Sequence, residues 1–311
     1  PPQWITRRQA LRFGGLSLLG IALGTFVPSY AFAYPFEITT VDERDIINAR
    51  IFPVFIDGNL CGSEPDSITV SGNSNFTVGY HQPSVVWKGA WGSPSASMNG
   101  LVVDAVYNRV GTNIENNRQA GVRVHISNFV KVTDSVQNWL RSYMGSTKNG
   151  VGLGKFSQST MCMWFEGIES ADFEYEFFYT DNPSENISAQ STIVTMMSLN
   201  SYDFGGQHLV EGFSLPEEVT KLYVPDTFVG QVDQTLTGRQ TYEHACYGWK
   251  FGDINIGVPN QRALSVSWEC PTDTIKIKPI ALCSRFGFNI SFNPIFTTTP
   301  ESPIKEYLIE R

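Results

Sequence analysis

The chain lacks most of the signatures by which a reaction is recognised in a sequence. It has no C-x-x-C pair, which leaves no basis for a zinc knuckle, a thioredoxin-type site or c-type haem attachment. It has no G-x-S-x-G motif, so the nucleophile elbow of a serine hydrolase is missing. Histidine is scarce, with 4 in 311 residues, and no H-x-H pair supports a transition-metal centre. No motif therefore fixes a reaction or a cofactor.

Charge is also sparse, and its balance is acidic. Charged residues make up 17% of the chain and aromatic residues 13%, a composition typical of a packed fold and not of disorder. The formal net charge is -8, and the first 33 residues contribute only basic groups, so the rest is more acidic still. Such a surface repels phosphate backbones and anionic headgroups, and we expect no nucleic-acid partner.

The first 33 residues carry three export signals in order. Thr6-Arg7-Arg8-Gln9-Ala10-Leu11-Arg12 precedes an apolar run, and Ala31-Phe32-Ala33 supplies the small-x-small site that signal peptidase needs. The segment resembles the twin-arginine (Tat) signal, with Arg7 and Arg8 as the paired arginines and Ala31 and Ala33 at the cleavage site. The resemblance implies export by the Tat translocase, which carries passengers that have already folded. The destination would be the periplasm, the thylakoid lumen or the medium.

A retained membrane anchor over residues 13–31 is the alternative. The apolar run over residues 13–27 would span only about 22 Å as a helix, short of the roughly 30 Å hydrocarbon core. Extension through Ala31 makes the helix long enough. The N-terminal segment 1–33 is thus either a signal peptide or an anchor helix, and it is the only part expected to meet a membrane.

The segment 34–296 predicts an all-β body. Short runs rich in Val, Ile, Thr, Phe and Tyr alternate with Gly, Pro, Asn, Asp and Ser clusters, and several runs show the two-residue period of a half-buried strand. We expect an antiparallel β-sandwich or jelly roll. Examples of the predicted strands are residues 50–56, 67–71, 101–107, 122–129, 173–180, 192–199, 264–268 and 274–282.

One short amphipathic helix interrupts the strands. Its apolar positions repeat at helical spacing between Val136 and Met144, with Asp134 as the expected N-cap and Gly145 after its end. The glycine-rich stretch 145–154 is then expected to be a loop, and a subdivision of the body is placed near residue 155. The segment 297–311 is expected to be a linker followed by a short tail helix.

A row of carboxylates is the first candidate for chemistry. Asp172, Glu174 and Glu176 alternate along one predicted strand, so their side chains share one face at intervals of about 6.5–7 Å. Glycosidases use two carboxylates as proton donor and nucleophile. The alternative is a strand with an aromatic core face and an acidic solvent face, which needs no function.

The stretch 172–177 resembles the active strand of laminarinase-type β-jelly-roll glycoside hydrolases. That family has the pattern Glu-x-Asp-x-Glu, and here the first two acidic positions are exchanged. The resemblance implies catalytic roles for Asp172 and Glu176, with Glu166 as a further carboxylate.

Calcium and carbohydrate are the other expected ligands. Asp181, Asn182 and Glu185 gather in one turn and offer the oxygen ligands that calcium prefers, although Asp and Asn are also ordinary turn residues. Trp87 and Trp91 bracket a stretch expected to be a turn. With Trp249 they are candidate platforms for sugar rings, although most Trp in a sandwich belongs to the core.

These patterns favour a non-catalytic binding or structural subunit on the far side of the membrane, with a protein or a polysaccharide as its partner. Two alternatives stay open. The first is a carbohydrate-active enzyme that uses the carboxylates, and the second is a calcium-stabilised surface or adhesin component.

Overall fold

The computed structural model describes most of the body of the chain. The described residues are 37–41, 64–81, 87–113, 116–154, 160–187, 191–197, 199, 201–216, 218–226, 228, 230–248, 266–270, 274–282 and 285–295. The export signal, residues 13–31, the tail 297–311, Trp249 and the strand expected over residues 50–56 lie outside them. Residues 35–311 form one compact unit.

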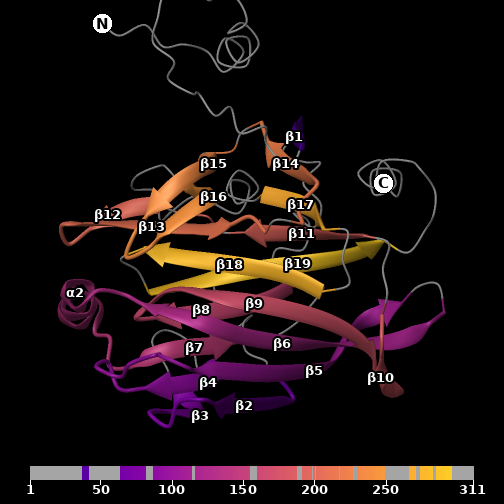
Figure 1. Ribbon diagram of the computed structural model, residues 1–311, viewed down its shortest axis with the longest axis horizontal. Coiled ribbons are helices and arrows are strands. Elements are labelled where there is room, and N and C mark those ends of the chain that lie inside the picture. Colours follow the sequence, from indigo (N-terminus) through magenta and orange to yellow (C-terminus); the bar gives the residue numbers. More distant parts are fainter. Residues whose placement is uncertain are drawn as a thin grey trace, which may run out of the picture. The chain divides into compact units, whose positions relative to one another are not determined.

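The described strands form two sheets (Figure 1). The nine-stranded sheet has the order β1-β14-β17-β11-β19-β8-β7-β4-β3. Its strands are β1 (Glu37–Val41), β3 (Phe76–His81), β4 (Trp87–Gly92), β7 (Asn149–Leu153), β8 (Thr160–Glu166), β11 (Ser191–Met197), β14 (Lys221–Pro225), β17 (Val266–Cys270) and β19 (Arg285–Ile295).

The ten-stranded sheet has the order β15-β16-β13-β18-β9-β6-β5-β2, with β10 and β12 paired off this path to β9 and β13. Its strands are β2 (Ser67–Ser71), β5 (Val102–Asn113), β6 (Arg118–Lys131), β9 (Ile168–Tyr179), β10 (Asn182–Asn186), β12 (Ser201–Phe204), β13 (Gln207–Ser214), β15 (Gly230–Thr237), β16 (Thr241–Gly248) and β18 (Thr274–Leu282). Of the described strand pairs, β1 with β14 is parallel and the others are antiparallel.

The two sheets share one apolar core. Along strands such as β9 and β18, alternate residues face inward, as a two-residue period requires. Phe165 of the nine-stranded sheet stacks on Phe173 of the ten-stranded sheet with ring centroids 5.9 Å apart, and Trp268 stacks on Phe213 at 4.8 Å. All four side chains are fully buried. The predicted antiparallel sandwich is therefore confirmed.

Each sheet joins an early half of the chain to a late half. Strands β2 to β9 gather on one side, and β11 to β17 with β1 gather on the other (Figure 1). Strands β18 and β19 lie between the halves: β18 pairs with β13 and β9, and β19 pairs with β11 and β8. We call this pair of strands the seam.

The predicted helix is present as α2 (Asp134–Met144). Its N-cap is Thr133 and not Asp134: the Thr133 hydroxyl accepts the Val136 N–H, and Asp134 occupies the first turn, where a carboxylate favours the helix dipole. Gly145 ends the helix in the left-handed conformation at φ 64°. Among the described residues, no helix has the length and apolar content needed to cross a membrane.

Two expected irregular segments are strands instead. The glycine-rich stretch contains β7, and the expected turn around Trp87 and Trp91 is β4, which pairs with β7. The glycines of β7 leave room for the two indole rings: a Cβ on Gly152 would lie 2.6 Å from the Trp87 Cβ, and one on Gly150 would lie 2.9 Å from the Trp91 ring. Glycine has low strand propensity, which is why this strand is hidden in the sequence.

The chain crosses between the two sheets several times, and one of these crossings follows residue 166. The subdivision expected near residue 155 stays a prediction. Strands β7 and β8, which flank residue 155, pair with each other in the nine-stranded sheet. The crossing to β9 of the other sheet is made by Gly167 at φ 67°, a left-handed conformation that glycine adopts without strain.

Candidate functional site

The solvent-facing side of the ten-stranded sheet carries rows of charged side chains. Across strands β6, β9 and β18, His125 lies opposite Glu174, and Glu174 lies opposite Lys276. The residues that neighbour them along each strand point into the core. The charged row therefore lies on the outer face of a sheet whose inner face is buried. Opposite charges facing each other across strands stabilise a sheet by roughly 0.2–1 kcal/mol a pair.

A cleft of about 380 Å³, which we call the central cleft, opens on this face. Strands β6, β9 and β18 form its floor, and the segment after β13 forms its wall with Leu215, Pro216 and Glu218. Ser127 and Ser214 add hydroxyl groups to the lining. The cleft therefore combines a rigid β floor with polar groups, as ligand sites commonly do.

A bulge in β6 fixes one edge of the central cleft. Asn128 adopts φ 51°, a left-handed conformation that Asn tolerates better than most residues, and the register with β9 shifts there. Its Nδ2 donates to Asp172 Oδ2 at 2.8 Å, while Lys278 Nζ lies 3.0 Å from Asp172 Oδ1. The Asp172 carboxylate is thus held from both sides.

Glu174 is a carboxylate of the central cleft that has no partner among the described residues. Both of its cross-strand neighbours pair elsewhere: His125 Nδ1 lies 2.7 Å from Asp104 Oδ1, and Lys276 Nζ lies 3.9 Å from Glu218 Oε1. Within the part of the chain that the structure describes, Glu174 has neither a hydrogen bond nor an ion pair. It is a half-buried carboxylate in the lining of a polar cleft.

The three predicted catalytic carboxylates do not come together. Asp172 and Glu176 lie on the outer face of the ten-stranded sheet, whereas Glu166 lies on the outer face of the other sheet. There Glu166 is fully buried, and its Oε2 lies 2.8 Å from His81 Nε2. Glu166 is separated from the other two by the whole core. A catalytic role for Asp172 and Glu176 stays a prediction.

The tryptophan platforms are placed in a buried cluster. Trp87 and Trp91 are 3% and 4% exposed, and they pack with Trp164 and Cys162 on the outer side of the nine-stranded sheet. Trp87 stacks on Trp164 with centroids 5.8 Å apart. Neither ring presents an open face to solvent, which matches the core alternative left open by the sequence. Trp249 lies outside the described residues.

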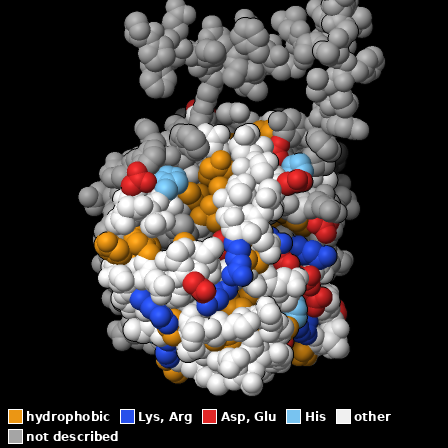
Figure 2. All heavy atoms as spheres, turned by 60° about the vertical axis from the view of Figure 1, so that its left-hand side comes forward, with side chains coloured by type: hydrophobic (Ala, Val, Ile, Leu, Met, Phe, Trp, Pro, Cys, Tyr) orange, Lys and Arg blue, Asp and Glu red, His pale blue; other side chains and the backbone are white. Residues whose placement is uncertain are grey.

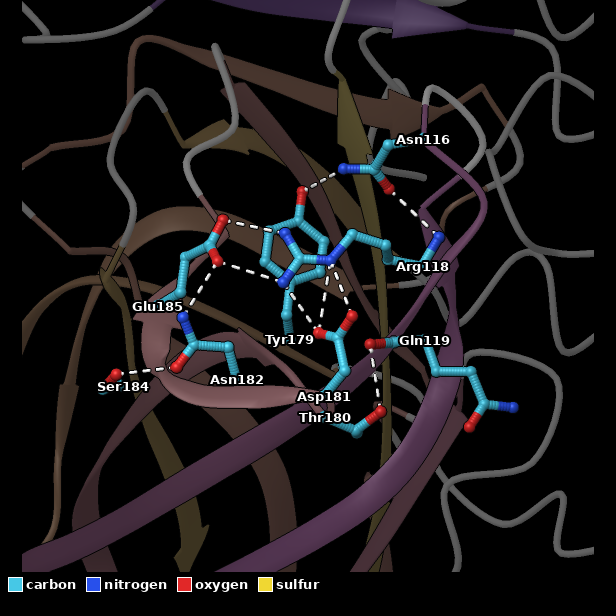
Figure 3. Close-up of polar contacts among 9 residues, drawn as sticks. All are labelled: Asn116, Arg118, Gln119, Tyr179, Thr180, Asp181, Asn182, Ser184 and Glu185. Atoms are coloured by element: carbon cyan, nitrogen blue, oxygen red, sulfur yellow. Dashed lines mark hydrogen bonds and ion pairs between the residues drawn. The ribbon is translucent and has the colours of Figure 1, made fainter.

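The predicted calcium ligands surround a guanidinium group (Figure 3). Arg118 Nη2 lies 2.7 Å from Asp181 Oδ1, and its Nη1 lies 2.8 Å from Glu185 Oε1. The same guanidinium lies 3.6 Å from the centroid of the Tyr179 ring. Asn182 donates to Glu185 at 3.2 Å. In this structure Arg118 thus supplies the positive charge that calcium was predicted to supply.

The ion pairs with Arg118 lower the pKa of both acids. The hydrogen bonds from Arg118 hold the pKa of Asp181 and of Glu185 below their ordinary values, and the same carboxylates raise the pKa of Arg118. A second arginine, Arg123, donates to the Asn186 side chain at 3.2 Å and to the Pro183 carbonyl. The two arginines fasten β10 over the end of β9, and we call this arrangement the β10 latch.

In the described part of the chain, no group of three or more His, Cys, Asp or Glu side chains is arranged to hold a metal ion. Calcium binding stays a prediction.

The sequence analysis found Asp172 and Glu174 of the central cleft, but it missed the residues of the other strands, Asn128, Lys276 and Lys278 among them. Lys276 and Lys278 alternate with apolar residues as regularly as the carboxylates of β9 do, so a one-sided charged strand was visible in both segments. Their pairing was not, because the two strands are about a hundred positions apart and only the tertiary fold sets their register. Asn128 gave no signal beyond its tolerance of left-handed backbone.

The charge on one face of the molecule is mixed. On the face that Figure 2 shows, basic and acidic side chains are interspersed without a broad field of one sign. Recognition on this face therefore rests on individual groups and their neighbours.

Comparisons with known proteins give resemblances of fold only. No protein-family model and no curated protein matches the sequence. The N-terminal domain of the Streptococcus gordonii adhesin Sgo0707 superposes with a TM-score of 0.49 at 12% identity, over 85% of this chain and 67% of that one. The adhesin domain of PrgB from Enterococcus faecalis, solved bound to DNA, gives a TM-score of 0.42 at 10% identity, over 67% and 71% of the two chains. Both likenesses are weak, and what this chain binds must follow from its own residues.

Proposed function

We propose that this chain is an exported, non-catalytic binding protein, and that the central cleft is its ligand-contacting surface. The export part rests on the twin-arginine pattern at Arg7 and Arg8 and on the small-x-small site that ends at Ala33. The binding part rests on the geometry of the cleft. The Tat translocase is then a partner during export.

The observation that carries the proposal is the state of Glu174. A half-buried carboxylate in a cleft normally has a partner, because a desolvated charge is costly when it stands alone. Here Lys276 and His125 flank it and pair with other acids. A ligand that brings an ammonium or guanidinium group would complete the row, and the hydroxyls of Ser127 and Ser214 would bind polar neighbours of that group.

The setting favours binding by a preformed site. Glu174 stands in the middle of β9, which pairs on both sides with long strands, and Asp172 beside it is held by Asn128 and Lys278. Such a site has little conformational entropy to lose when it binds. We infer a ligand with a cationic group, such as a Lys or Arg side chain of a protein partner.

The test compares two isosteric variants on one strand face. Binding of a lysine-rich, a glutamate-rich and a neutral glycine–serine peptide is measured on immobilised protein by surface plasmon resonance. Wild type should prefer the lysine-rich peptide, and Glu174→Gln should weaken that binding at least tenfold. Glu176→Gln, which removes the same charge outside the cleft, should leave it nearly unchanged. Equal losses in both variants would show a mere field effect of the acidic chain and reject the site.

The hydrolase alternative uses carboxylates on the same face of the sheet, but it predicts cleavage of a polysaccharide. A panel of β-glucans would be cleaved by the wild type and not by Glu176→Gln. Absence of cleavage on every polymer leaves the binding proposal standing, and cleavage lost in that variant replaces it.

The export part is tested on native material. A mass that matches residues 34–311 in a soluble fraction supports removal of the signal after Ala33. A full-length mass in a membrane fraction would show that residues 13–31 anchor the protein.

A further inference from the structure

A second cleft, of about 600 Å³, lies at the end of the ten-stranded sheet and takes no part in the proposed function. We call it the end cleft. It is bounded by the loop between β4 and β5, the end of β6, the start of α2 and the turn between β15 and β16. Five of the eleven residues that line it carry a hydroxyl or amide side chain: Ser95, Ser97, Asn99, Thr133 and Gln240.

Arg239 is the positive group that the end cleft holds in place. Its backbone N–H donates to Glu169 Oε1 at 2.7 Å, and that carboxylate is 5% exposed. Its Nη1 donates to the Lys131 carbonyl at 3.1 Å. Arg239 is thus held both at its backbone and at its guanidinium group. Most of the five N–H donors of the guanidinium remain available for a ligand.

Lys131 adds a second positive charge beside it. Its Nζ lies 3.5 Å from Asp134 Oδ1, but the Asp134 side chain is 94% exposed and the Lys131 side chain is 15% exposed. Because its acidic partner is almost fully solvated, this ion pair contributes little to stability. Of the charged residues that line the end cleft, two are basic and one is acidic, which is the reverse of the whole chain.

The loop between β4 and β5, which also lines the end cleft, is fixed as well. The side chain of Asn73 donates to the carbonyls of Ser97 and Asn99 at 2.8 Å and 2.9 Å, and so pins the loop between β4 and β5. The hydroxyl and amide groups of this loop therefore face the cleft from a held backbone. Each can both donate and accept, as sugar hydroxyls can.

These groups select a ligand by two kinds of chemistry. A guanidinium with free donors binds a carboxylate through two parallel hydrogen bonds, and the hydroxyl and amide lining suits a polyhydroxylated neighbour. The net charge of -8 disfavours a densely charged polyanion. Widely spaced carboxylates avoid most of that repulsion, because screening at physiological salt limits it to about 8 Å.

We propose that the end cleft binds a carboxylated polysaccharide, with Arg239 on the carboxylate and Lys131 as a second positive contact. The end cleft shares no lining residue with the central cleft, so this proposal is tested independently of the proposed function.

The test uses oligosaccharides of alternating uronic acid and N-acetylhexosamine, together with the same oligosaccharides after reduction of each carboxylate to an alcohol. Binding to the full chain is measured by calorimetry at low and physiological salt. Wild type should bind the acidic form and lose at least tenfold on the reduced form. Arg239→Gln should cause a similar loss, and Lys131→Gln a smaller one. The acidic form should bind more weakly at higher salt.

Arg109→Gln is the matched control. Arg109 is an exposed arginine of β5 in the same sheet, it does not line the end cleft, and its loss changes the net charge equally. Equal effects of Arg109→Gln and Arg239→Gln, equal binding of the reduced oligosaccharide, or no binding at all would each overturn the proposal. Tighter binding of a glutamate-rich peptide would assign the site to acidic protein instead. Glu174→Gln should bind the oligosaccharide like wild type, which separates this outcome from that of the central cleft.

Discussion

Glu169 is one of the glutamates that the structure buries, and three donors converge on its Oε1. They are the backbone N–H groups of Arg239 at 2.7 Å and Gln240 at 3.3 Å, and the Tyr242 hydroxyl at 2.8 Å. The carboxylate thus holds the turn between β15 and β16 against β9. The position of Arg239 in the end cleft depends on a residue that contacts no ligand.

We therefore expect Glu169→Gln to lower the free energy of unfolding by about 2 kcal/mol, because the charged acceptor of three hydrogen bonds becomes neutral. Urea unfolding followed by tryptophan fluorescence measures the change. Glu176→Gln, an exchange of the same kind at a half-buried position without hydrogen bonds in the described chain, should stay within about 0.5 kcal/mol of wild type. Equal stability of the two variants would show that the convergent donors contribute nothing.

Single residues also show where sequence reasoning stops. The alternation in β9 correctly separates Phe173 and Tyr175, which are fully buried, from the carboxylates between them. The sequence around Trp87 does not show whether its ring is buried or exposed. The space that the ring fills is left by glycines of a separate strand, β7. Burial of a large ring is decided by its partners, and those partners are distant in the chain.

At the scale of elements, the β10 latch is the feature with a defined pH response. The lowered pKa values of Asp181 and Glu185 mean that the latched form favours their ionised state. That contribution is fully present above the unfolded-state pKa values, about 3.9 and 4.3. It is lost as the pH falls through the lower pKa values of the folded form.

We expect the amides of β10 to lose hydrogen-exchange protection as the pH falls below about 4, after correction for the intrinsic rate. The amides of β6 should keep theirs over the same range. Arg118→Gln should leave β10 weakly protected at every pH, and the exposed Arg109→Gln should behave like wild type. Protection of β10 that is independent of both pH and Arg118 would mean that its backbone pairing alone holds it.

The elements themselves were predicted with uneven success, for physical reasons. The strands over residues 67–71 and 274–282 were found with their true bounds, and the helix was found with its true end. Strands β4 and β7 were missed because glycines interrupt their pattern. The latch was missed because Arg118 comes some sixty positions before its acids, and the sequence shows only the acids.

At the scale of the whole molecule, the seam is the link through which we expect the two halves to unfold together. Ile275 of β18 is fully buried and lies opposite Tyr175 of β9, within the core that both halves share. We expect Ile275→Ala to cost about 3 kcal/mol through the cavity that it leaves. Hydrogen exchange should show amides of β6 and β13, one in each half, losing equal protection.

Val78→Ala is the control for that substitution. Val78 is 44% exposed on the edge strand β3, so its truncation should change stability by less than about 0.5 kcal/mol. Loss of protection confined to one half in Ile275→Ala would show that the halves unfold separately and that the seam does not couple them.

The sandwich class followed from strand periodicity alone, whereas the order of strands within each sheet did not. Local patterns show that a segment has one apolar face, but β8 and β19 pair across more than a hundred intervening residues. The central cleft could not be predicted from the sequence for the same reason, because its segments meet only in the folded chain.

The seam also bears on how the protein is made. Strands β18 and β19 follow all the other described strands in the chain, yet they close both sheets. During synthesis the early half can form its hairpins, but neither sheet is joined until the seam has left the ribosome. If export uses the twin-arginine route, which accepts folded passengers, release from the ribosome must come before translocation. Formation of β18 and β19 would then decide when the folded body is ready for translocation.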